Sequence, residues 1–300
     1  MSFASDIKLE LLQEEMRNPC CVRAELCALV CFSGAVLPPG RVRISTENAA
    51  VAQRGYSLIK EYTGIAGEIV TTPPRGVRGK STYAIEIKKE EDGLRLLSAL
   101  GLLSKNGVSF RANAVEEACC RRAFLRGAFL GGGTVANPEK EYHMEITTPR
   151  EGLSEDIVSM FSSFGLTART CRRKMNYVVY FKSSEEIGDA LNIIGAPMAY
   201  MEFTSVRILK ERRNSVNRRV NCESANLDKT IDAGQTQLAA IRRLSACGKL
   251  SSLPDTLRET AEARIENPEA TLSELAAILK ISKSGAAHRM RKLLEISKTL

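Results

Sequence analysis

Length, composition and charge narrow the class of protein. The chain has 300 residues, 44% of them hydrophobic, which suffices for about two domains with aliphatic cores, since Trp is absent and aromatic residues make up 5%. Its formal net charge of +8 favours an anionic partner, nucleic acid first, although a basic protein can also simply be soluble. The sequence lacks the apolar runs of a membrane span and of a signal peptide, so we expect no membrane association.

Cysteine usage indicates a reducing compartment. The nine cysteines are odd in number and include the adjacent pairs Cys20–Cys21 and Cys119–Cys120, which does not fit a disulfide framework. Cys27 and Cys31 are four apart on a predicted helix, but no second pair with ligand spacing follows them. We therefore expect buried thiols, no metal site, no cofactor and a cytoplasmic, nucleoid-associated location.

The first 200 residues contain an internal repeat with an offset of 99 positions. Residues 20–26 (CCVRAEL) correspond to residues 119–125 (CCRRAFL). The segments 26–34 and 125–133 that follow are apolar and end at glycine, as helices often do. One short apolar motif could recur by chance, but matched helices, turns and strands over two halves argue against chance.

Each copy predicts the element order αββαββα. In the first copy, two strands around a proline turn are expected in 33–48, a helix over 49–63, strands over 67–73 and 81–89, and a closing helix near 91–103. In the second, the corresponding segments are 131–149, 151–165, 167–173, 176–182 and 184–194. The halves span about 18–104 and 115–195 of a predicted domain over 1–198.

This pattern resembles the LAGLIDADG homing-endonuclease fold, an α+β pseudo-symmetric domain. In that family two motif helices pack along a pseudo-twofold axis, and small residues are needed where the helices touch. Ala28 and Gly127 take the seam positions here, whereas Phe32 departs from the small residue that Gly131 supplies in the second copy. The resemblance implies a saddle of two antiparallel sheets that could follow a DNA major groove.

The family's catalytic acids are missing. The resemblance places them at Ser33 and Gly132, at the feet of the two motif helices, and neither residue can hold a divalent metal as a carboxylate would. Residues 26–46 and 118–138 contain no Asp or Glu. We therefore expect no enzyme activity. The alternative, a metal-dependent homing-type endonuclease, would need carboxylates from elsewhere.

Basic residues are also expected on the saddle strands, namely Arg41, Arg43, Arg172, Arg173 and Lys174. They could contact phosphates, or they could equally form a solvated strand face. Three nearby acids, Glu47, Glu139 and Glu141, would oppose DNA. The saddle is for that reason also a candidate to dock a protein.

A basic linker is predicted over 199–222. Its segment 210–221 (KERRNSVNRRVN) carries five basic residues and one acid, so it either lies against phosphate or is a solvated connector. The candidate phosphate contacts are Lys210, Arg212, Arg213, Arg218 and Arg219.

An all-α domain is predicted over 223–300. An apolar pattern predicts a helix from Ala225 onward, through Leu227, Ile231, Leu238, Ile241 and Leu244. A second helix is expected over Pro254–Glu266, since proline suits a first turn. Its expected apolar stripe is Leu257, Ala261 and Ile265.

The segment 271–296 predicts a helix-turn-helix. Thr271 and Glu274 match a capping box, Ile281 would fill the turn, and Ser282 can cap the second helix. Lys280 stands where glycine is commoner, so a positive φ is possible there. The expected core positions are Leu272, Leu275, Ala276, Leu279, Ala286, Met290, Leu293 and Leu294.

The second helix of this motif would enter a major groove of double-stranded DNA, unless the segment is an ordinary helical hairpin. Base-edge contacts are expected from Ser284, Ala287, His288 and Arg291, and phosphate contacts from Lys283, Arg289 and Lys292, with Ser282 at the helix start.

The combination resembles the WhiA family over nearly the whole chain. The resemblance rests on the degenerate motif pair, residues 217–237 (NRRVNCESANLDKTIDAGQTQ) and residues 273–293 (SELAAILKISKSGAAHRMRKL). The family's distinctive stretch includes Asn221, Asn226, Lys229 and Thr230. The resemblance implies a DNA-binding transcription regulator in sporulation, cell division or chromosome segregation, and a second regulator or sigma factor as a possible partner.

Overall fold

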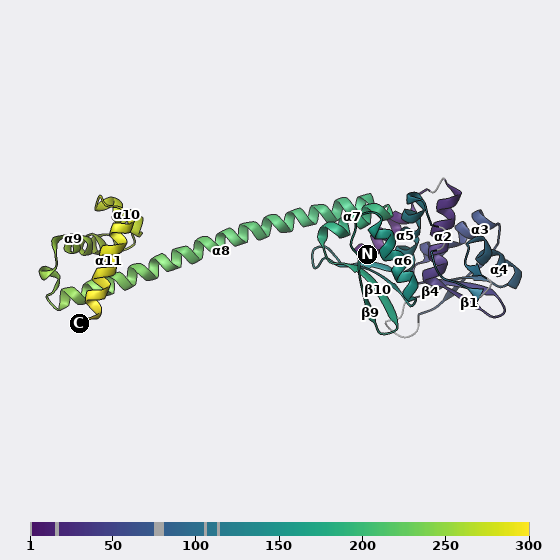
Figure 1. Cartoon of the computed structure of the whole chain (residues 1–300), viewed down its shortest axis with the longest axis horizontal. Coiled ribbons are helices and arrows are strands. Elements are labelled where there is room, and N and C mark those ends of the chain that lie inside the picture. Colours follow the sequence, from purple (N-terminus) through teal and green to yellow (C-terminus); the bar gives the residue numbers. More distant parts are fainter. Residues whose placement is uncertain (1, 16–17, 75–80, 105–106, 113–114, 300) are drawn as a thin grey trace. The chain divides into compact units, whose positions relative to one another are not determined.

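The computed structural model describes residues 2–15, 18–74, 81–104, 107–112 and 115–299. It divides the chain into two compact units, Met1–Lys210 and Glu211–Leu300. Helix α8 (Pro197–Ala246) contributes residues to both (Figure 1). Each unit has a hydrophobic core of its own.

The amino-terminal unit contains the predicted repeat. Its first half comprises α2 (Pro19–Ser33), β1 (Gly34–Leu37), β2 (Arg41–Thr46), α3 (Ala49–Thr63), β3 (Glu68–Thr72), β4 (Thr82–Ile87) and α4 (Glu90–Ala99). Its second half comprises α5 (Ala118–Gly132), β7 (Gly133–Val135), β8 (Met144–Thr148), α6 (Glu151–Ser162), β9 (Arg169–Arg173), β10 (Asn176–Phe181) and α7 (Ser184–Ile194). The predicted order αββαββα is confirmed in both halves.

The two halves form equivalent antiparallel sheets. The strand orders are β1-β2-β4-β3 and β7-β8-β10-β9. Apolar residues pair at the middle of each sheet, Ile44 with Ile85 and Ile146 with Val179. These residues are buried, so one face of each sheet packs against helices while polar side chains occupy the other face.

A helix and a two-stranded hairpin lie outside the predicted repeat. Helix α1 (Phe3–Leu12) was not predicted, and it buries Phe3, Ile7 and Leu11 in the same core. The closing helix expected near 91–103 was predicted too long. Helix α4 ends at Ala99 before Gly101, whose φ of 71° is left-handed, and β5 (Leu103–Ser104) then pairs with β6 (Gly107–Val108).

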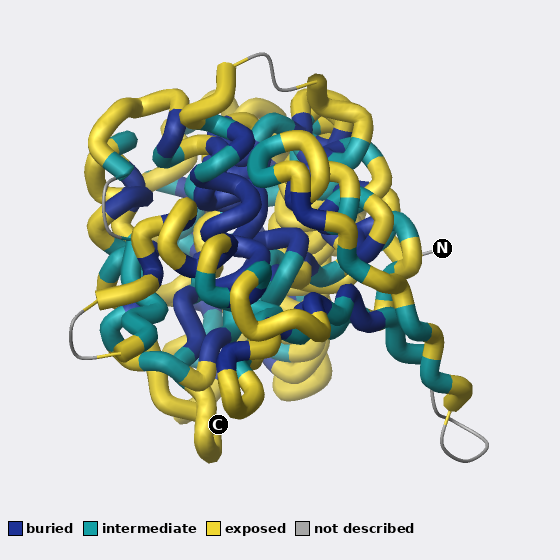
Figure 2. The backbone as a smooth tube through the Cα atoms, turned by 90° about the vertical axis from the view of Figure 1, so that its right-hand side faces the viewer, coloured by how far each residue is buried: buried dark blue, intermediate teal, exposed yellow. Residues whose placement is uncertain are grey.

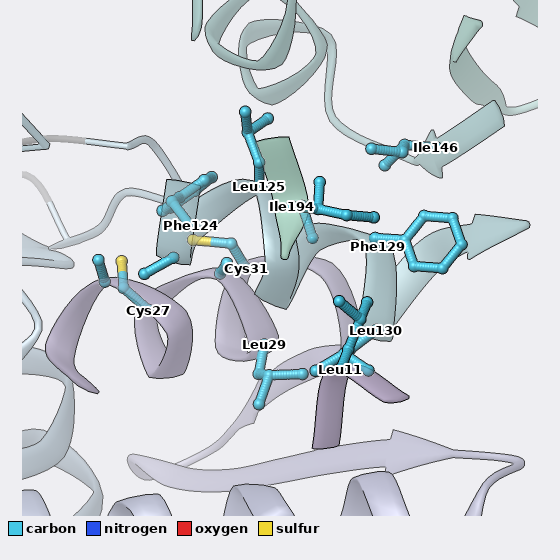
Figure 3. Close-up of a cluster of buried hydrophobic side chains, with 14 of the residues drawn as sticks. Leu11, Cys27, Leu29, Cys31, Phe124, Leu125, Phe129, Leu130, Ile146 and Ile194 are labelled. Atoms are coloured by element: carbon cyan, nitrogen blue, oxygen red, sulfur yellow. The ribbon is translucent and has the colours of Figure 1, made fainter. Parts of the chain in front are cut away.

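The motif helices α2 and α5 form the centre of the unit. Every residue of α2 from Ala24 to Cys31 is buried, as is every residue of α5 from Ala123 to Leu130. Figure 2 shows buried residues in dark blue at the centre of the tube. Figure 3 shows Cys27, Leu29 and Cys31 of α2 beside Phe124 and Leu130 of α5. The buried positions of Cys27 and Cys31 confirm that prediction.

Glycine permits the close approach of these helices, as the sequence predicted. A Cβ on Gly127 would collide with the backbone oxygen of Glu25 and lie 2.8 Å from the Cβ of Ala28. A Cβ on Gly131 would lie 2.9 Å from the Cβ of Phe32. The bulk of Phe32 in one copy is therefore matched by the missing side chain of Gly131 in the other.

A buried ion network crosses the same seam. Glu25 of α2 is fully buried, and its carboxylate accepts a hydrogen bond from Nε of Arg54 at 3.0 Å and from Nη1 of Arg126 at 3.3 Å. Burial raises the pKa of Glu25, and the two guanidinium groups oppose that rise. Nε of Arg126 also donates to the carbonyl of Ile194, which ties α5 to the end of α7.

The carboxyl-terminal unit is helical. Residues 199–222, predicted as a linker, are helical and lie inside α8. The unit continues with a 3-10 turn (Leu250–Ser252), α9 (Asp255–Glu266), α10 (Leu272–Ile278) and α11 (Lys283–Lys298). Within the described residues, no helix is long and apolar enough to cross a bilayer.

The core of this unit is smaller than its apolar pattern predicts. Its hydrophobic cluster comprises Ile241, Leu244, Leu257, Ala261, Ala263, Leu275, Met290 and Leu293, and the expected core residues Ala276 and Ala286 are buried as well. Three expected core residues are exposed instead, Leu227 at 60%, Ile231 at 48% and Ile265 at 46%. Leu227 and Ile231 lie on a stretch of α8 that is exposed almost throughout, so periodicity alone overstates its burial.

The seam predicts a large effect of Gly127→Ala. The new methyl group would force the backbones of α2 and α5 apart, and we expect the amino-terminal unit to lose at least about 2 kcal/mol of unfolding free energy. Urea unfolding followed by tyrosine fluorescence measures this, because all seven tyrosines lie in this unit and Trp is absent. Gly188→Ala is the matched control. Its Cβ would meet only the ring edge of Tyr200 at 3.3 Å, and an equal loss there would contradict the seam argument.

Candidate nucleic-acid interface

The helix-turn-helix begins at a capping box. The Thr271 hydroxyl accepts a hydrogen bond from the backbone N–H of Glu274 at 3.2 Å, and the Glu274 carboxylate accepts one from the N–H of Thr271 at 2.7 Å. The hydrogen bonds from Thr271 lower the pKa of Glu274. The predicted start of α10 is thereby confirmed. Residues 271–274 contain both partners of each capping hydrogen bond, so this helix start needs no distant contact.

The turn into α11 also follows the sequence prediction. Lys280 has a φ of 54°, the left-handed conformation that a glycine-like position requires. The N–H of Ile281 donates to the carbonyl of Ala276 at 2.9 Å, which closes the end of α10. The Ser282 hydroxyl then accepts from the N–H of Gly285 at 3.1 Å and caps α11.

Helix α11 has one buried and one exposed face. Ala286, Met290 and Leu293 are buried against the core, and Leu294 is half-buried. The opposite face exposes Lys283, Ser284, His288, Arg291 and Lys292. Among the described residues, none of the cations on this face is paired with an acid. The helix therefore presents an uncompensated positive surface.

Three of the candidate residues are less free than the sequence suggested. Ala287 is half-buried, and the Ser284 hydroxyl lies 3.0 Å from that of Ser282. Arg289, expected to contact phosphate, is also half-buried, and its Nη1 donates to the carbonyl of Thr256 on α9 at 3.3 Å. This bond positions α11 against α9 and leaves Arg289 with fewer donors for a phosphate.

The five basic candidates on α8 lie in two different environments. Nζ of Lys210 donates to the carbonyl of Pro138 at 3.1 Å and lies 4.6 Å from the centre of the Tyr142 ring. Lys210 is thus bound within the amino-terminal unit, contrary to its expected role as a free phosphate contact. The other four candidates, Arg212, Arg213, Arg218 and Arg219, are exposed on the helix.

Arg264 is a candidate functional residue that the sequence analysis did not identify. Only 2% of it is exposed, burial lowers its pKa, and its Nη1 donates to carbonyls of the loop after α9, including that of Pro268 at 3.4 Å. It borders a cavity of about 340 Å³ that Lys229, Thr230 and Lys283 also line. Arg264 lies at helical spacing from the apolar residues Leu257 and Ala261, but its side chain is charged. No sequence signal therefore marked it as buried.

The saddle strands carry compensated charge. Arg43 lies 3.6 Å from Glu86, and Arg173 lies 3.2 Å from Glu145. Arg41 is exposed and donates to the carbonyl of Pro38. Arg172 stacks over a tyrosine ring, and Lys174 occupies the β9–β10 turn with a φ of 57°. The saddle is therefore a mixed surface rather than a uniformly positive one.

The feet of the motif helices lie together, and the terminal residue of each helix is not an acid. Ser33 is the last residue of α2 and Gly132 the last of α5, and the Ser33 hydroxyl donates to the carbonyl of Gly131 at 3.3 Å. Sequence reasoning missed Arg150, whose guanidinium donates to the carbonyls of Cys31 and Gly34 and stacks 3.7 Å from the Phe110 ring centre. A cation thus caps the foot of α2.

Comparison with known proteins agrees with both units. Residues 19–103 match the family described as the WhiA N-terminal LAGLIDADG-like domain, residues 121–213 the WhiA LAGLIDADG-like domain, and residues 216–297 the WhiA C-terminal HTH domain. Two relatives named "Probable cell division protein WhiA" come from Alkaliphilus metalliredigens (41% identical, covering 99% of this chain and 98% of the relative) and Bacillus subtilis (40%, covering 100% and 97%).

Solved structures agree on the fold. Full-length DUF199/WhiA from Thermatoga maritima superposes with a TM-score of 0.62 at 23% identity, covering 100% of this chain and 99% of that one. The N-terminal LAGLIDADG domain of DUF199/WhiA superposes with a TM-score of 0.53 at 22% identity, covering 65% and 90%.

Fold and site together define a class of protein in which a LAGLIDADG-like domain is joined to a helix-turn-helix domain. Within that class, the chain belongs to the WhiA family, on the evidence of relatives about 40% identical over their whole length.

The left-handed residue in the turn gives a test of the motif's geometry. We expect Lys280→Gly to stabilise the turn by up to about 1 kcal/mol, because glycine adopts this φ without strain, and Lys280→Val to destabilise it by at least as much. Hydrogen exchange of α10 and α11 amides in the full-length chain should slow in the glycine variant and accelerate in the valine variant. Two variants that shift exchange in the same direction would refute the assignment of strain to this residue.

Proposed function

We propose that this protein is a DNA-binding transcription regulator that reads double-stranded DNA through α11. The observation that carries the proposal is the exposed cationic face of α11, whose cations pair with no acid among the described residues, while its opposite face is anchored in the core. A helix held in this way on a helix-turn-helix can enter the major groove. The names of the relatives support a role in cell division. The roles in chromosome segregation or sporulation rest on the sequence resemblance alone.

We assign different tasks to the side chains of this face. His288 and Arg291 are exposed, and we assign them to base edges together with Ser284 and Ala287 nearer the helix start. Lys283 and Lys292 contact phosphate, which contributes affinity without sequence information. Arg212, Arg213, Arg218 and Arg219 add a second phosphate-binding segment on α8.

We propose further that the LAGLIDADG-like unit is catalytically inactive. Ser33 and Gly132 supply no carboxylate, and the guanidinium of Arg150 at the foot of α2 would repel a divalent cation there. Among the described residues, no cluster of acids or histidines gathers at the feet of these helices. The unit then serves binding or assembly.

The saddle is proposed to dock a protein, with a second transcription regulator or a sigma factor as the kind of partner. Its alternating Arg43–Glu86 and Arg173–Glu145 pairs suit a polar protein surface better than a polyanion. A regulator of this kind acts in the cytoplasm, on the nucleoid.

Substitutions on α11 test base reading against phosphate binding. With a duplex recovered from genomic DNA by the full-length chain, Arg291→Ala or His288→Ala should cost about 1–3 kcal/mol and relax sequence preference. Lys292→Ala should weaken all duplexes alike and reduce the salt slope by about one unit, because it removes one phosphate contact. Gel-shift titrations over a range of salt concentrations measure both effects.

Arg95→Ala on α4 is the matched control, since it removes the same charge from an exposed ion pair in the other unit. The affinity of this control variant for the duplex should equal that of the unmodified chain. Unchanged affinity in all of the α11 variants would show that another surface binds DNA.

The inactivity of the first unit is tested with supercoiled plasmid. After incubation of the full-length chain with Mg²⁺ or Mn²⁺, we expect the plasmid to stay supercoiled, because no carboxylate at the feet can hold the metal. Reproducible nicking that a substitution at Ser33 or Gly132 alters would establish a nuclease instead.

A further inference from the structure

Four cysteines from distant parts of the sequence meet at one point. The Sγ atoms of Cys20, Cys21, Cys119 and Cys120 all lie within 4.8 Å of one another, and those of Cys119 and Cys120 are 3.9 Å apart. In the part of the chain that the structure describes, this is the only cluster of three or more potential metal-binding side chains. Of these four thiols, only Cys120 is buried, whereas Cys20 and Cys119 are exposed and Cys21 is half-buried.

The internal repeat explains why the pairs converge. Each pair occupies the second and third positions of its motif helix, since α2 begins at Pro19 and α5 at Ala118. The helices pack side by side along the seam, and equivalent positions in the two copies therefore face each other across it. A pair of cysteines in one copy, repeated in the other, becomes a set of four.

The amino-terminal ends of the two motif helices make this point a favourable environment for thiolate ligands. The amino termini of two helices direct partial positive charge toward the sulfurs, and neither N-cap residue, Asn18 or Glu117, caps its helix through its side chain.

Access and enclosure also suit an ion. Cys20 and Cys119 are exposed, which provides a path from solvent, whereas Cys120 is buried and forms the floor. A small cavity of about 40 Å³ beside Cys20 and Cys120 is also lined by Arg23, a cation able to offset a negatively charged thiolate centre.

We propose that Cys20, Cys21, Cys119 and Cys120 form a four-thiolate site for a soft divalent cation, zinc in the cell. Four sulfurs about 2.3 Å from a tetrahedral zinc lie about 3.8 Å from one another, so closure by about 1 Å completes the geometry. On binding, each thiol gives its proton to solvent and its sulfur bonds the metal, with no change in oxidation state.

Such a site is structural rather than catalytic. All four positions of the tetrahedron are occupied by protein sulfur, which leaves no place for water or substrate. The metal joins the first half of the repeat to the second at the amino-terminal end of the seam. It stabilises the arrangement of the two sheets by binding only the folded unit.

The test uses the full-length chain purified under reducing conditions without chelator. Elemental analysis should find about one zinc per chain, and Co²⁺ added to the metal-free chain should give the intense thiolate-to-cobalt bands of a tetrahedral site. Zinc should raise the midpoint of thermal unfolding, followed by tyrosine fluorescence, by at least about 5 °C over the metal-free chain.

The double variant Cys119→Ser/Cys120→Ala should lose at least tenfold in zinc affinity together with the cobalt bands. Cys171→Ser/Cys222→Ser is the matched control, because it removes two exposed thiols outside the cluster. Equal loss in both double variants would overturn the proposal.

Should the ligand variant fail to fold, the unmodified chain decides the question alone. The site is refuted if the reduced chain takes up neither zinc nor cobalt and chelator leaves its thermal unfolding midpoint unchanged. A disulfide between the two cysteine pairs, isolated with no metal bound, refutes it as well.

Discussion

The close packing of α2 against α5 is the constraint on which the amino-terminal unit depends. Gly127 and Ala28 let the two backbones touch, and no larger side chain fits between them. Because the helices are buried on nearly every side, their separation sets the positions of both sheets. The Glu25–Arg54–Arg126 network is tolerated at this depth because each charge finds a partner, and removing one would leave the others unpaired.

The same seam has different chemistry at its two ends. At the foot, where an endonuclease would hold its metal, a hydroxyl, a glycine and the guanidinium of Arg150 meet. At the amino-terminal end, four thiols converge. A framework built for close helix packing thus keeps its architecture while a few side chains decide whether an ion can bind and which ion it is.

The helix-turn-helix was more predictable than the rest because its signals are local. The capping box at Thr271, the left-handed Lys280 and the Ser282 cap each involve atoms within a few residues of one another. A sequence window contains all the partners, so the geometry follows from it. Arg289 shows the limit of this reasoning, because its partner Thr256 lies 33 positions away on α9.

The sequence by itself determined the repeat and the order of elements in each half, because periodicity and motif spacing encode local geometry. The resemblance to a known family then identified the seam glycines and the missing acids. Tertiary structure alone decided the burial of Arg264, the capture of Lys210 by Pro138 and Tyr142, and the exposure of Leu227 and Ile231 on α8. These features depend on which distant surfaces meet, and one sequence carries no record of those contacts. The convergence of the two cysteine pairs needed both, because the repeat set their equivalent positions on α2 and α5 and the packing of these helices brought them together.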